Sequence, residues 1–416
     1  MPRAAHMSAS PVDHGAVVVC GAGAAGMAAA LAAARGGAPV LLLEAGRQVG
    51  GTVAHALIHT LAGLFGSDGQ HLHDGLPREL ADRLHAADSR TRVRKMGRAW
   101  VLSVCPNIYR DTVARWIAHD RRITVRCGAR VTRIATIGQR VCELEVAAGG
   151  SSNCLRPAAV IDATGTAEVA RLIDNSCVCD DDRRAAGGWI VRVRGIAPGA
   201  LDFPKGIGIV RALRDAAHTN RLPWHCSHAW IDAGIDNDEA FVKLFVPLDA
   251  RWRDADRHCE ISHAAQTSVA DVVEFLKQWP DFARAEITQS GSLGVRDGGR
   301  IRGRYTLTAA DVRQGRTFAD AVCRCAWPIE YWDPERGVSI EYLPVGKHYD
   351  IPMRALQLEG IDNFWAVGKC LSADRYAHAS ARVVGACWAM GEAAGAAAAS
   401  QPAGVEDRRE LVRAIS

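Results

Sequence analysis

The first clear hydrophobic pattern in the chain predicts a β-α-β unit. The apolar run Ala16–Cys20 has the length and composition of a buried strand, and Val40–Glu44 is a second run of the same kind. Between them, Ala25–Arg35 is long enough for a helix and consists almost entirely of small residues. We therefore expect two neighbouring strands joined by a short helical crossover.

Helical and strand-like patterns follow one another further along the chain. Residues 53–120 look mainly helical, and the best-defined helices are expected at Leu76–Leu84 and Tyr109–His119. From Ile123 to Val146, apolar and polar residues alternate in runs separated by glycine, which predicts a small meander of strands. The segment AAVIDATG at 158–165 predicts another buried strand.

The second half of the chain is mixed and then becomes rich in alanine and glycine. Within residues 167–345 we expect several strands and a helix around Ser268–Trp279. The segment NFWAVG predicts a short strand, and Ser380–Ala399 predicts one long helix. The charged segment 406–415 predicts a short closing helix.

Composition limits the classes of protein that this chain can be. Its 416 residues are enough for two domains, or for one domain with a large insertion. The net charge of +4 is small for this length and argues against a nucleic-acid-binding surface, so the basic run at 90–98 is interpreted as a solvated face. The 13 cysteines form no CxxC pair and are irregularly spaced, which argues against a disulfide framework and against CxxC zinc sites.

No segment has the composition of a membrane anchor or a signal peptide. The first fifteen residues lack an apolar core, and the alanine-rich runs are too weakly hydrophobic to span a bilayer. We therefore expect a cytoplasmic protein with no membrane and no nucleic-acid partner.

Three spaced glycines predict a dinucleotide-binding site. Gly21, Gly23 and Gly26 follow a strand and open a helix, where they permit a tight turn, a close approach of backbone to pyrophosphate, and close packing of helix on strand. The helix N-terminus, including Ala25, would bind the pyrophosphate. Glu44, followed by Ala45, ends the second strand, where its carboxylate could accept hydrogen bonds from ribose hydroxyls and would repel a 2′-phosphate.

NAD and FAD share this fingerprint, and a resemblance separates them. EAGRQVGGT at 44–52 and VIDATG at 160–165 resemble segments of the glutathione-reductase-like flavoproteins, in their fumarate-reductase-like branch. Residues 363–399 resemble the C-terminal FAD segment of bacterial FAD-dependent oxidoreductases, in which a helix N-terminus meets the pyrimidine side of the flavin. The resemblance implies FAD as the cofactor and the following residues beside it: Gly50, Gly51, Thr52, Ala163, Thr164, Gly165, Gly368, Arg382, Val383 and Val384.

Two further segments, at 295–312 and 348–356, are similar to the same family, whereas residues of about 170–290 show no recognisable resemblance to it. One position departs from the wider superfamily. Many relatives have an acidic residue directly after the glycine of the last strand, where it contacts the ribityl chain, but here Lys369 follows Gly368. That contact must come from elsewhere in this protein.

These observations predict an α/β fold with two domains. A Rossmann-like FAD-binding domain with a parallel sheet is expected from residues 16–166 and 346–400, with a helical insertion at about 53–120. A mixed, largely antiparallel substrate domain is expected at 167–345. Residues 1–15 are expected to be a disordered N-terminus and 401–416 a C-terminal tail. The active site should lie where the inserted domain meets the flavin.

Four histidines are candidates for proton transfer, because an imidazole titrates near neutral pH. His55 and His59 are four residues apart and would share a face if helical, but no third metal ligand is evident, so no metal site is expected. The alternative is one buried structural histidine and one exposed histidine. His348 and His378 lie in the family-like segments, from which each could reach the flavin.

Arginines are candidates for holding a substrate carboxylate. Arg300, Arg302 and Arg304 alternate along an expected strand, which would place all three on one face. One of them, Arg300 above all, or Arg354 could bind the substrate. Arg382 is expected on the flavin side, and the alternative for it is a surface salt bridge.

The absence of certain motifs from the sequence reduces the number of possible reaction types. No second glycine fingerprint provides an NAD(P)H domain, and no CxxxxC disulfide follows the GGT. The leading hypothesis is hydride transfer from a small organic substrate to the flavin, with reoxidation by oxygen or another acceptor; the tryptophan-rich middle favours an aromatic or bulky substrate. The alternatives are an FAD-dependent monooxygenase using transiently bound NAD(P)H, or a non-catalytic flavin-binding maturation or interaction protein.

Overall fold

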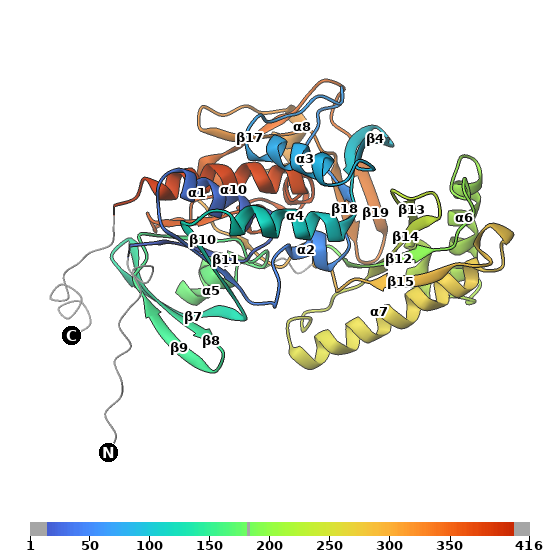
Figure 1. Cartoon of the computed structure of the whole chain (residues 1–416), viewed down its shortest axis with the longest axis horizontal. Coiled ribbons are helices and arrows are strands. Elements are labelled where there is room, and N and C mark those ends of the chain that lie inside the picture. Colours follow the sequence, from blue (N-terminus) through green and yellow to red (C-terminus); the bar gives the residue numbers. More distant parts are fainter. Residues whose placement is uncertain (1–14, 181–183, 403–416) are drawn as a thin grey trace, which may run out of the picture.

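The computed structural model describes residues 15–180 and 184–402, and its centre is a five-stranded parallel sheet (Figure 1). The strand order is β21-β10-β1-β2-β6, so strands from both ends of the chain meet in one sheet. The expected β-α-β unit is present, because β1 and β2 pair in parallel. The five strands are β1 (Val17–Cys20), β2 (Val40–Glu44), β6 (Ile123–Cys127), β10 (Ala159–Asp162) and β21 (Phe364–Ala366).

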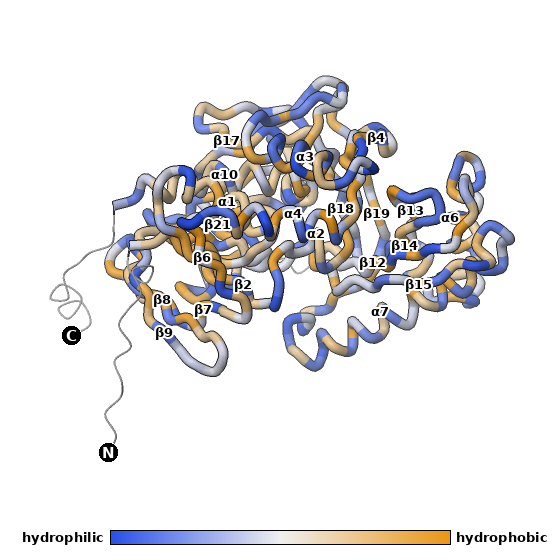
Figure 2. The backbone as a smooth tube through the Cα atoms, viewed as in Figure 1, coloured by the Kyte–Doolittle hydropathy of each residue, from blue (hydrophilic) through white to orange (hydrophobic). Residues whose placement is uncertain are grey.

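Two alanine-rich helices, α1 (Ala24–Arg35) and α10 (Val384–Ala399), lie against each other beside this sheet (Figure 1). Their contact depends on small residues. A Cβ atom on Gly391 would lie 2.1 Å from the carbonyl oxygen of Ala25, and one on Gly395 would lie 2.2 Å from that of Ala29. The pair of helices belongs to the largest hydrophobic core, and Figure 2 shows hydrophobic residues along these central elements.

The prediction of one helix at Ser380–Ala399 was wrong. Two helices are present, α9 (Arg375–Ala381) and α10, separated by Arg382 and Val383. Val383 is extended, and the Gly385 N–H donates to the carbonyl of Ala62 instead of continuing the helix of α9. A tertiary hydrogen bond therefore breaks the helix at the point where it meets the rest of the molecule.

Residues 53–120 contain a small antiparallel sheet as well as helices, so the expectation of a mainly helical region was only partly correct. Its strand order is β3-β5-β4. The elements are α2 (Gly51–His55), β3 (Thr60–Leu61), α3 (Leu76–Ala87), β4 (Arg92–Met96), β5 (Ala99–Ser103) and α4 (Pro106–Ala118).

The meander expected over Ile123–Val146 is only partly present, because Ile123–Cys127 forms β6 of the parallel sheet. The antiparallel sheet begins at Ala129, has a third strand at Ser151–Leu155 and is followed by a short helix. A buried side chain connects the meander to the parallel sheet, because Asn363 hydrogen-bonds both backbone groups of Val141 and the carbonyl of Ala158. The elements are β7 (Ala129–Ile137), β8 (Arg140–Ala148), β9 (Ser151–Leu155) and α5 (Glu168–Ile173).

A second sheet, antiparallel and of order β13-β14-β12-β15, forms a separate lobe at the right of Figure 1. Its strands alternate between two environments. Trp189, Val191 and Val193 face a core shared with two helices, so Gly188 and Ile190 face the opposite way. The helix predicted from Ser268 begins earlier, at Ala255. The elements are β12 (Gly187–Arg194), α6 (Lys205–His218), β13 (Trp230–Ala233), β14 (Glu239–Val246), α7 (Ala255–Leu276) and β15 (Glu286–Ser290).

The chain between this lobe and the last parallel strand returns to the first body. Several of its residues, including Trp327 and Trp332, belong to the core that contains α1 and α10. The elements of this segment are β16 (Arg300–Ile301), α8 (Ala309–Gln314), β17 (Ala321–Cys325), β18 (Ile329–Asp333), β19 (Gly337–Glu341) and β20 (Tyr349–Pro352). β16 pairs with β11 (Val178–Cys179), which precedes the lobe in the chain. The division at 167–345 stays a prediction, while the separate core of the second lobe spans residues 189–293.

Within residues 15–180 and 184–402, none of the helices combines the length and the apolar composition needed to cross a bilayer. The expectations for residues 1–14 and for a helix at 406–415 lie outside the described residues.

Candidate active site

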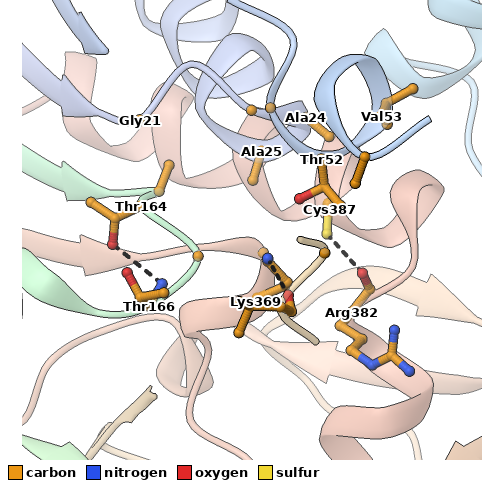
Figure 3. A pocket seen from close by; sticks show the side chains of 18 of the residues that line it. Gly21, Ala24, Ala25, Thr52, Val53, Thr164, Thr166, Lys369, Arg382 and Cys387 are labelled. Atoms are coloured by element: carbon orange, nitrogen blue, oxygen red, sulfur yellow. Dashed lines mark hydrogen bonds between the residues drawn. The ribbon is translucent and has the colours of Figure 1, made fainter. Parts of the chain in front are cut away.

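A cavity of about 650 Å³ runs from the carboxyl ends of β1, β2 and β10 to the inner face of the second lobe. Ligands of open parallel sheets bind at this edge. In the view of Figure 3, Gly21 and Thr164 lie on one side of the cavity, and Thr52 and Arg382 lie on the other.

The predicted glycines form a tightly packed turn on the cavity wall. Gly21 has φ +102°, and a Cβ on it would lie 2.5 Å from the carbonyl oxygen of Ala163. A Cβ on Gly51, whose φ is +52°, would lie 2.6 Å from the Cα of Gly23. Gly23 itself has no atom closer than 3.8 Å to its Cβ position, so its free face is open to a ligand. A diphosphate can therefore approach backbone N–H groups here, at the start of α1.

Glu44 ends β2 in the cavity wall, with Ala45 beside it. Its carboxylate accepts hydrogen bonds from the backbone N–H groups of Ala22 (2.8 Å) and Gly46 (2.7 Å). These bonds hold the carboxylate at the site where a ribose would bind, and carboxylate oxygens have further lone pairs for the ribose hydroxyls.

The ATG turn is organised by a buried carboxylate that the sequence analysis did not single out. Asp162 accepts hydrogen bonds from the Thr164 hydroxyl (2.6 Å) and from the backbone N–H groups of Thr164, Val169 and Ala170. Burial raises the pKa of Asp162, although these hydrogen bonds act in the opposite direction. Ala163, Thr164 and Gly165 line the cavity as predicted, and the Thr164 hydroxyl also accepts from the Thr166 N–H (Figure 3).

The C-terminal segment supplies Gly368, Lys369 and the break between α9 and α10 to the same wall. A Cβ on Gly368, whose φ is +67°, would lie 2.9 Å from the Cβ of Ala25. Lys369 Nζ donates to the carbonyl of Val295 (2.7 Å), and burial lowers its pKa. Arg382, Val383 and Val384 line the cavity, and the Cys387 thiol donates to the Arg382 carbonyl (Figure 3).

The family model described as FAD dependent oxidoreductase matches residues 16–411. The chain belongs to the FAD-dependent oxidoreductase family. FAD is accordingly the cofactor of this enzyme, and the cavity fits it, because the glycine turn, Glu44 and the ATG turn lie along one wall. Among the residues predicted to bind FAD, Gly26 and Gly50 do not line the cavity. Gly26 packs against Gly21, and Gly50 starts α2 with a φ of +118°.

No curated protein matches this FAD-dependent oxidoreductase. Solved structures that match the chain include a geranylgeranyl bacteriochlorophyll reductase-like protein from Thermoplasma acidophilum, at 14% identity and a TM-score of 0.49, over 92% of this chain and 76% of that one. The flavin-dependent brominase Bmp2 matches at 14% identity and 0.47, over 93% and 78%. An anhydrotetracycline hydroxylase from Streptomyces rimosus matches at 16% and 0.44, over 70% and 54%. Such distant similarity carries no information about the substrate.

The inner face of the second lobe closes the cavity of the oxidoreductase. Pairing of β12 with β14 places Ile190 opposite Lys243, and both line the cavity. Lys243 forms an ion pair with Asp232 of β13, which also accepts from the indole N–H of Trp230 (2.9 Å). Burial alone would raise the pKa of Asp232, but the Lys243 ammonium holds it well below its usual range.

The segment around β18 contributes a polar and aromatic corner to the cavity. Arg296 donates to the carbonyl of Ala186 (2.7 Å), and its guanidinium carbon lies 3.8 Å from the ring centroid of Trp332. The Glu330 carboxylate accepts hydrogen bonds from the indoles of Trp332 (2.8 Å) and Trp327 (3.1 Å). All four side chains line the cavity.

Sequence reasoning did not single out Lys243, Arg296 or Glu330 as site residues. A lone lysine inside the apolar strand Glu239–Val246 was a usable signal, since a charged residue is rarely placed there without a partner. Arg296 lies inside the family-like segment 295–312, four residues before Arg300.

The expectation that His55 and His59 share a helical face was wrong. α2 ends at His55, and Leu57 has a φ of +57°, so the chain turns between the two histidines. His55 is exposed, whereas His59 is buried and stacked on Phe241 at 3.8 Å, outside the cavity lining. Burial and the nearby Lys243 ammonium lower the pKa of His59.

Arg300 and His378 lie in a buried cluster behind the cavity wall. The Arg300 Nε lies 3.4 Å from a carboxylate oxygen of Asp297, and its Nη1 donates to the carbonyl of Ala373. His378 Nε2 lies 2.9 Å from the carbonyl oxygen of Lys369, which does line the cavity. Neither candidate is in the lining, so each reaches the site only through its neighbours.

The remaining candidates lie on the surface. The expectation that Arg300, Arg302 and Arg304 share one strand face was wrong, because the strand ends at Ile301. Arg300 is buried, whereas Arg302 and Arg304 are exposed. Arg354 pairs with Asp320 (3.0 Å), and His348 lies 4.0 Å from Asp350, outside the cavity lining. Over the described residues, no group of three or more His, Cys, Asp or Glu is placed to hold a metal ion.

Proposed function

We propose that this enzyme oxidises a small organic substrate bound between FAD and the inner face of the second lobe, with the electrons passing to oxygen or another acceptor. One observation carries the proposal. The cavity that holds the glycine turn and Glu44 is continuous with a wall of Lys243, Arg296 and Trp332, so cofactor and substrate share one space. FAD, when bound, supplies the two-electron redox chemistry that side chains lack.

The chain's own groups provide binding, orientation and charge. α10 begins at the cavity wall, and its N-terminal end and the Arg382 guanidinium favour negative charge on a group bound there. The Nζ of Lys243, held by Asp232, can donate a hydrogen bond to a substrate oxygen. Trp327, Trp332 and Ile190 provide an apolar surface that excludes water around the substrate. We place the enzyme in the fumarate-reductase-like branch on the strength of its GGT and ATG segments.

Anaerobic reduction of the purified protein tests this proposal. The visible spectrum establishes the FAD content, and acid precipitation shows whether the FAD is covalently attached. Bleaching of the flavin by an organic substrate alone supports oxidation of that substrate. A strict requirement for NAD(P)H would replace the proposal with a monooxygenase reaction, and a protein that stays colourless after reconstitution with FAD would contradict both.

A further inference from the structure

Within the described residues, two arginine side chains of the cavity wall form no ion pair with a carboxylate. Arg296 and Arg382 donate to the backbone carbonyls of Ala186 (2.7 Å) and Glu330 (3.4 Å). Among the described residues, no carboxylate oxygen lies within 4.0 Å of either guanidinium. The Nε of Arg382 is buried and lacks a hydrogen-bond partner in this part of the chain. Both side chains are half-buried, and a partly desolvated cation with no ion pair within 4.0 Å favours an anion at this corner of the cavity.

The electrostatics of the corner agree with this. Burial, followed by the repulsion of Arg382, lowers the pKa of Arg296 to about 9, and burial also lowers the pKa of Arg382. Glu330 acts in the opposite direction on both, but its two carboxylate oxygens are occupied by the indole N–H groups of Trp327 and Trp332. Asp297 also favours the charged form of Arg382, but its carboxylate lies 3.4 Å from Arg300. Glu330 is thus the carboxylate that acts on both guanidinium groups, and the charge at the corner stays positive.

Arg296 is held in position for a planar ligand. Its guanidinium stacks on Trp332, and the absence of a side chain at Gly188 makes room for it, because a Cβ there would lie 3.1 Å from Nη2. A guanidinium has five N–H donors, and within the described residues Arg296 uses one of them, toward Ala186. The remaining donors can take a carboxylate in the two-point geometry that suits arginine.

We propose that Arg296, with Arg382 beside it, binds the carboxylate group of an organic acid substrate. This inference rests on the proposed function and names the substrate class of the same site. The diphosphate of FAD is not a competing occupant, because its expected contacts are the glycine turn and the start of α1. Arg382 lies at the α9–α10 break beside the helix N-terminus, where it is expected to contact the flavin. Substitution of Arg296 therefore tests substrate binding without changing the expected FAD contacts.

The test measures binding of simple anions to the FAD-loaded full chain. Acetate, succinate and benzoate are each titrated against their uncharged amides, and inorganic phosphate is titrated separately, with the visible flavin spectrum and the melting temperature as readouts. At least one carboxylate is expected to bind at least about tenfold more tightly than its amide, which corresponds to roughly 1.4 kcal/mol. Equal binding of every acid and its amide, no binding of any acid, or a preference for phosphate would overturn the proposal.

Variants assign the binding to Arg296. Arg296→Gln should lose the preference for the acid, and Arg296→Lys should retain part of it. Gly188→Ala displaces the guanidinium without removing its charge and should weaken carboxylate binding, which keeps the test valid if Arg296→Gln fails to fold. Arg302→Gln, on an exposed arginine outside the cavity, is the matched control and should bind as the parent does.

The two proposals fail in different ways. An unchanged preference in Arg296→Gln and Gly188→Ala, with FAD retained and reduced by substrate, refutes the carboxylate site alone. Loss of FAD, or failure of every organic substrate to reduce it, refutes the proposed function.

Discussion

The carbonyl oxygen of Gly21 lies 1.8 Å from the point that a Cβ atom on Gly26 would occupy. Gly26→Ala must therefore shift α1 away from β1, and we expect a protein that melts at a much lower temperature and holds no FAD. Gly23→Ala has room for its methyl group, so it should fold normally and lose FAD affinity only.

Circular dichroism melting and the fluorescence of released flavin measure the two effects. Gly208→Ala in α6 is the control, because nothing lies within 4 Å of its Cβ position. It should be neutral or stabilise by up to about 1 kcal/mol, since alanine is the better helix former. Normal FAD binding by Gly26→Ala would contradict the structure of this turn.

Breaking the ion pair between Lys243 and Asp232 is predicted to lower the free energy of unfolding strongly. Lys243→Met leaves the buried Asp232 carboxylate beside the neutral ring of His59, whose Nε2 lies 3.7 Å away. We expect a loss of about 3 kcal/mol in the free energy of unfolding. The double variant Lys243→Met/Asp232→Asn should recover part of this loss, because no unpaired charge remains. Urea unfolding of Lys243→Met, Asp232→Asn and the double variant measures the coupling energy, and strict additivity of the two single losses would count against the ion pair.

The free energy of unfolding should decrease on acidification, because two buried histidines, His378 and His59, stay neutral in the folded protein. Burial lowers the pKa of His378 to about 4, with Asp297 only partly opposing this effect. The unfolded chain takes up this proton near pH 6.5, so the unfolded state binds more protons between pH 6.5 and 4, and stability declines as the pH falls through that range. The contribution of His378 is up to about 3 kcal/mol, and His59 acts in the same direction.

Urea midpoints at pH 7.5 and 5 measure this dependence. His378→Gln should flatten it, because glutamine keeps a donor for the Lys369 carbonyl but does not titrate. His119→Gln, on an exposed histidine, should leave the dependence as it is in the parent. A parent protein as stable at pH 5 as at pH 7.5 would be inconsistent with neutral buried histidines.

Substitution of Asn363, a buried polar residue outside the cavity, is predicted to lower stability strongly. It is fully buried and makes three hydrogen bonds to the backbone of Val141 and Ala158. Asn363→Ala leaves those backbone groups unsatisfied and should cost about 3 kcal/mol or more in urea unfolding. Its neighbour Asp362 makes only an exposed ion pair with Arg304, so Asp362→Ala should cost less than about 1 kcal/mol. Similar losses in both variants would argue against this role of Asn363.

The sequence by itself determined the cofactor-binding half of this protein. Gly21, Gly23 and Gly51 are recognisable because close backbone approach and positive φ are local requirements that only glycine meets easily. Glu44 and the ATG turn stand at strand ends, whose position follows from a short hydrophobic run. The β-α-β unit and the dinucleotide-binding turn could therefore be predicted from neighbouring residues alone, whereas the choice of FAD over NAD needed the resemblance to a family.

Only the tertiary structure decided which residues line the part of the cavity that faces the second lobe. His55 and His59 are separated by a turn at Leu57, and Arg300 is buried behind the wall rather than on it, because long-range packing determines which way these side chains face. Lys243, Arg296 and Glu330 come from three distant segments of the chain and line one cavity only because the second lobe packs beside the parallel sheet. The spacing of these residues along the chain does not predict that they line the same cavity, because their relative positions depend on how the two hydrophobic cores pack against each other.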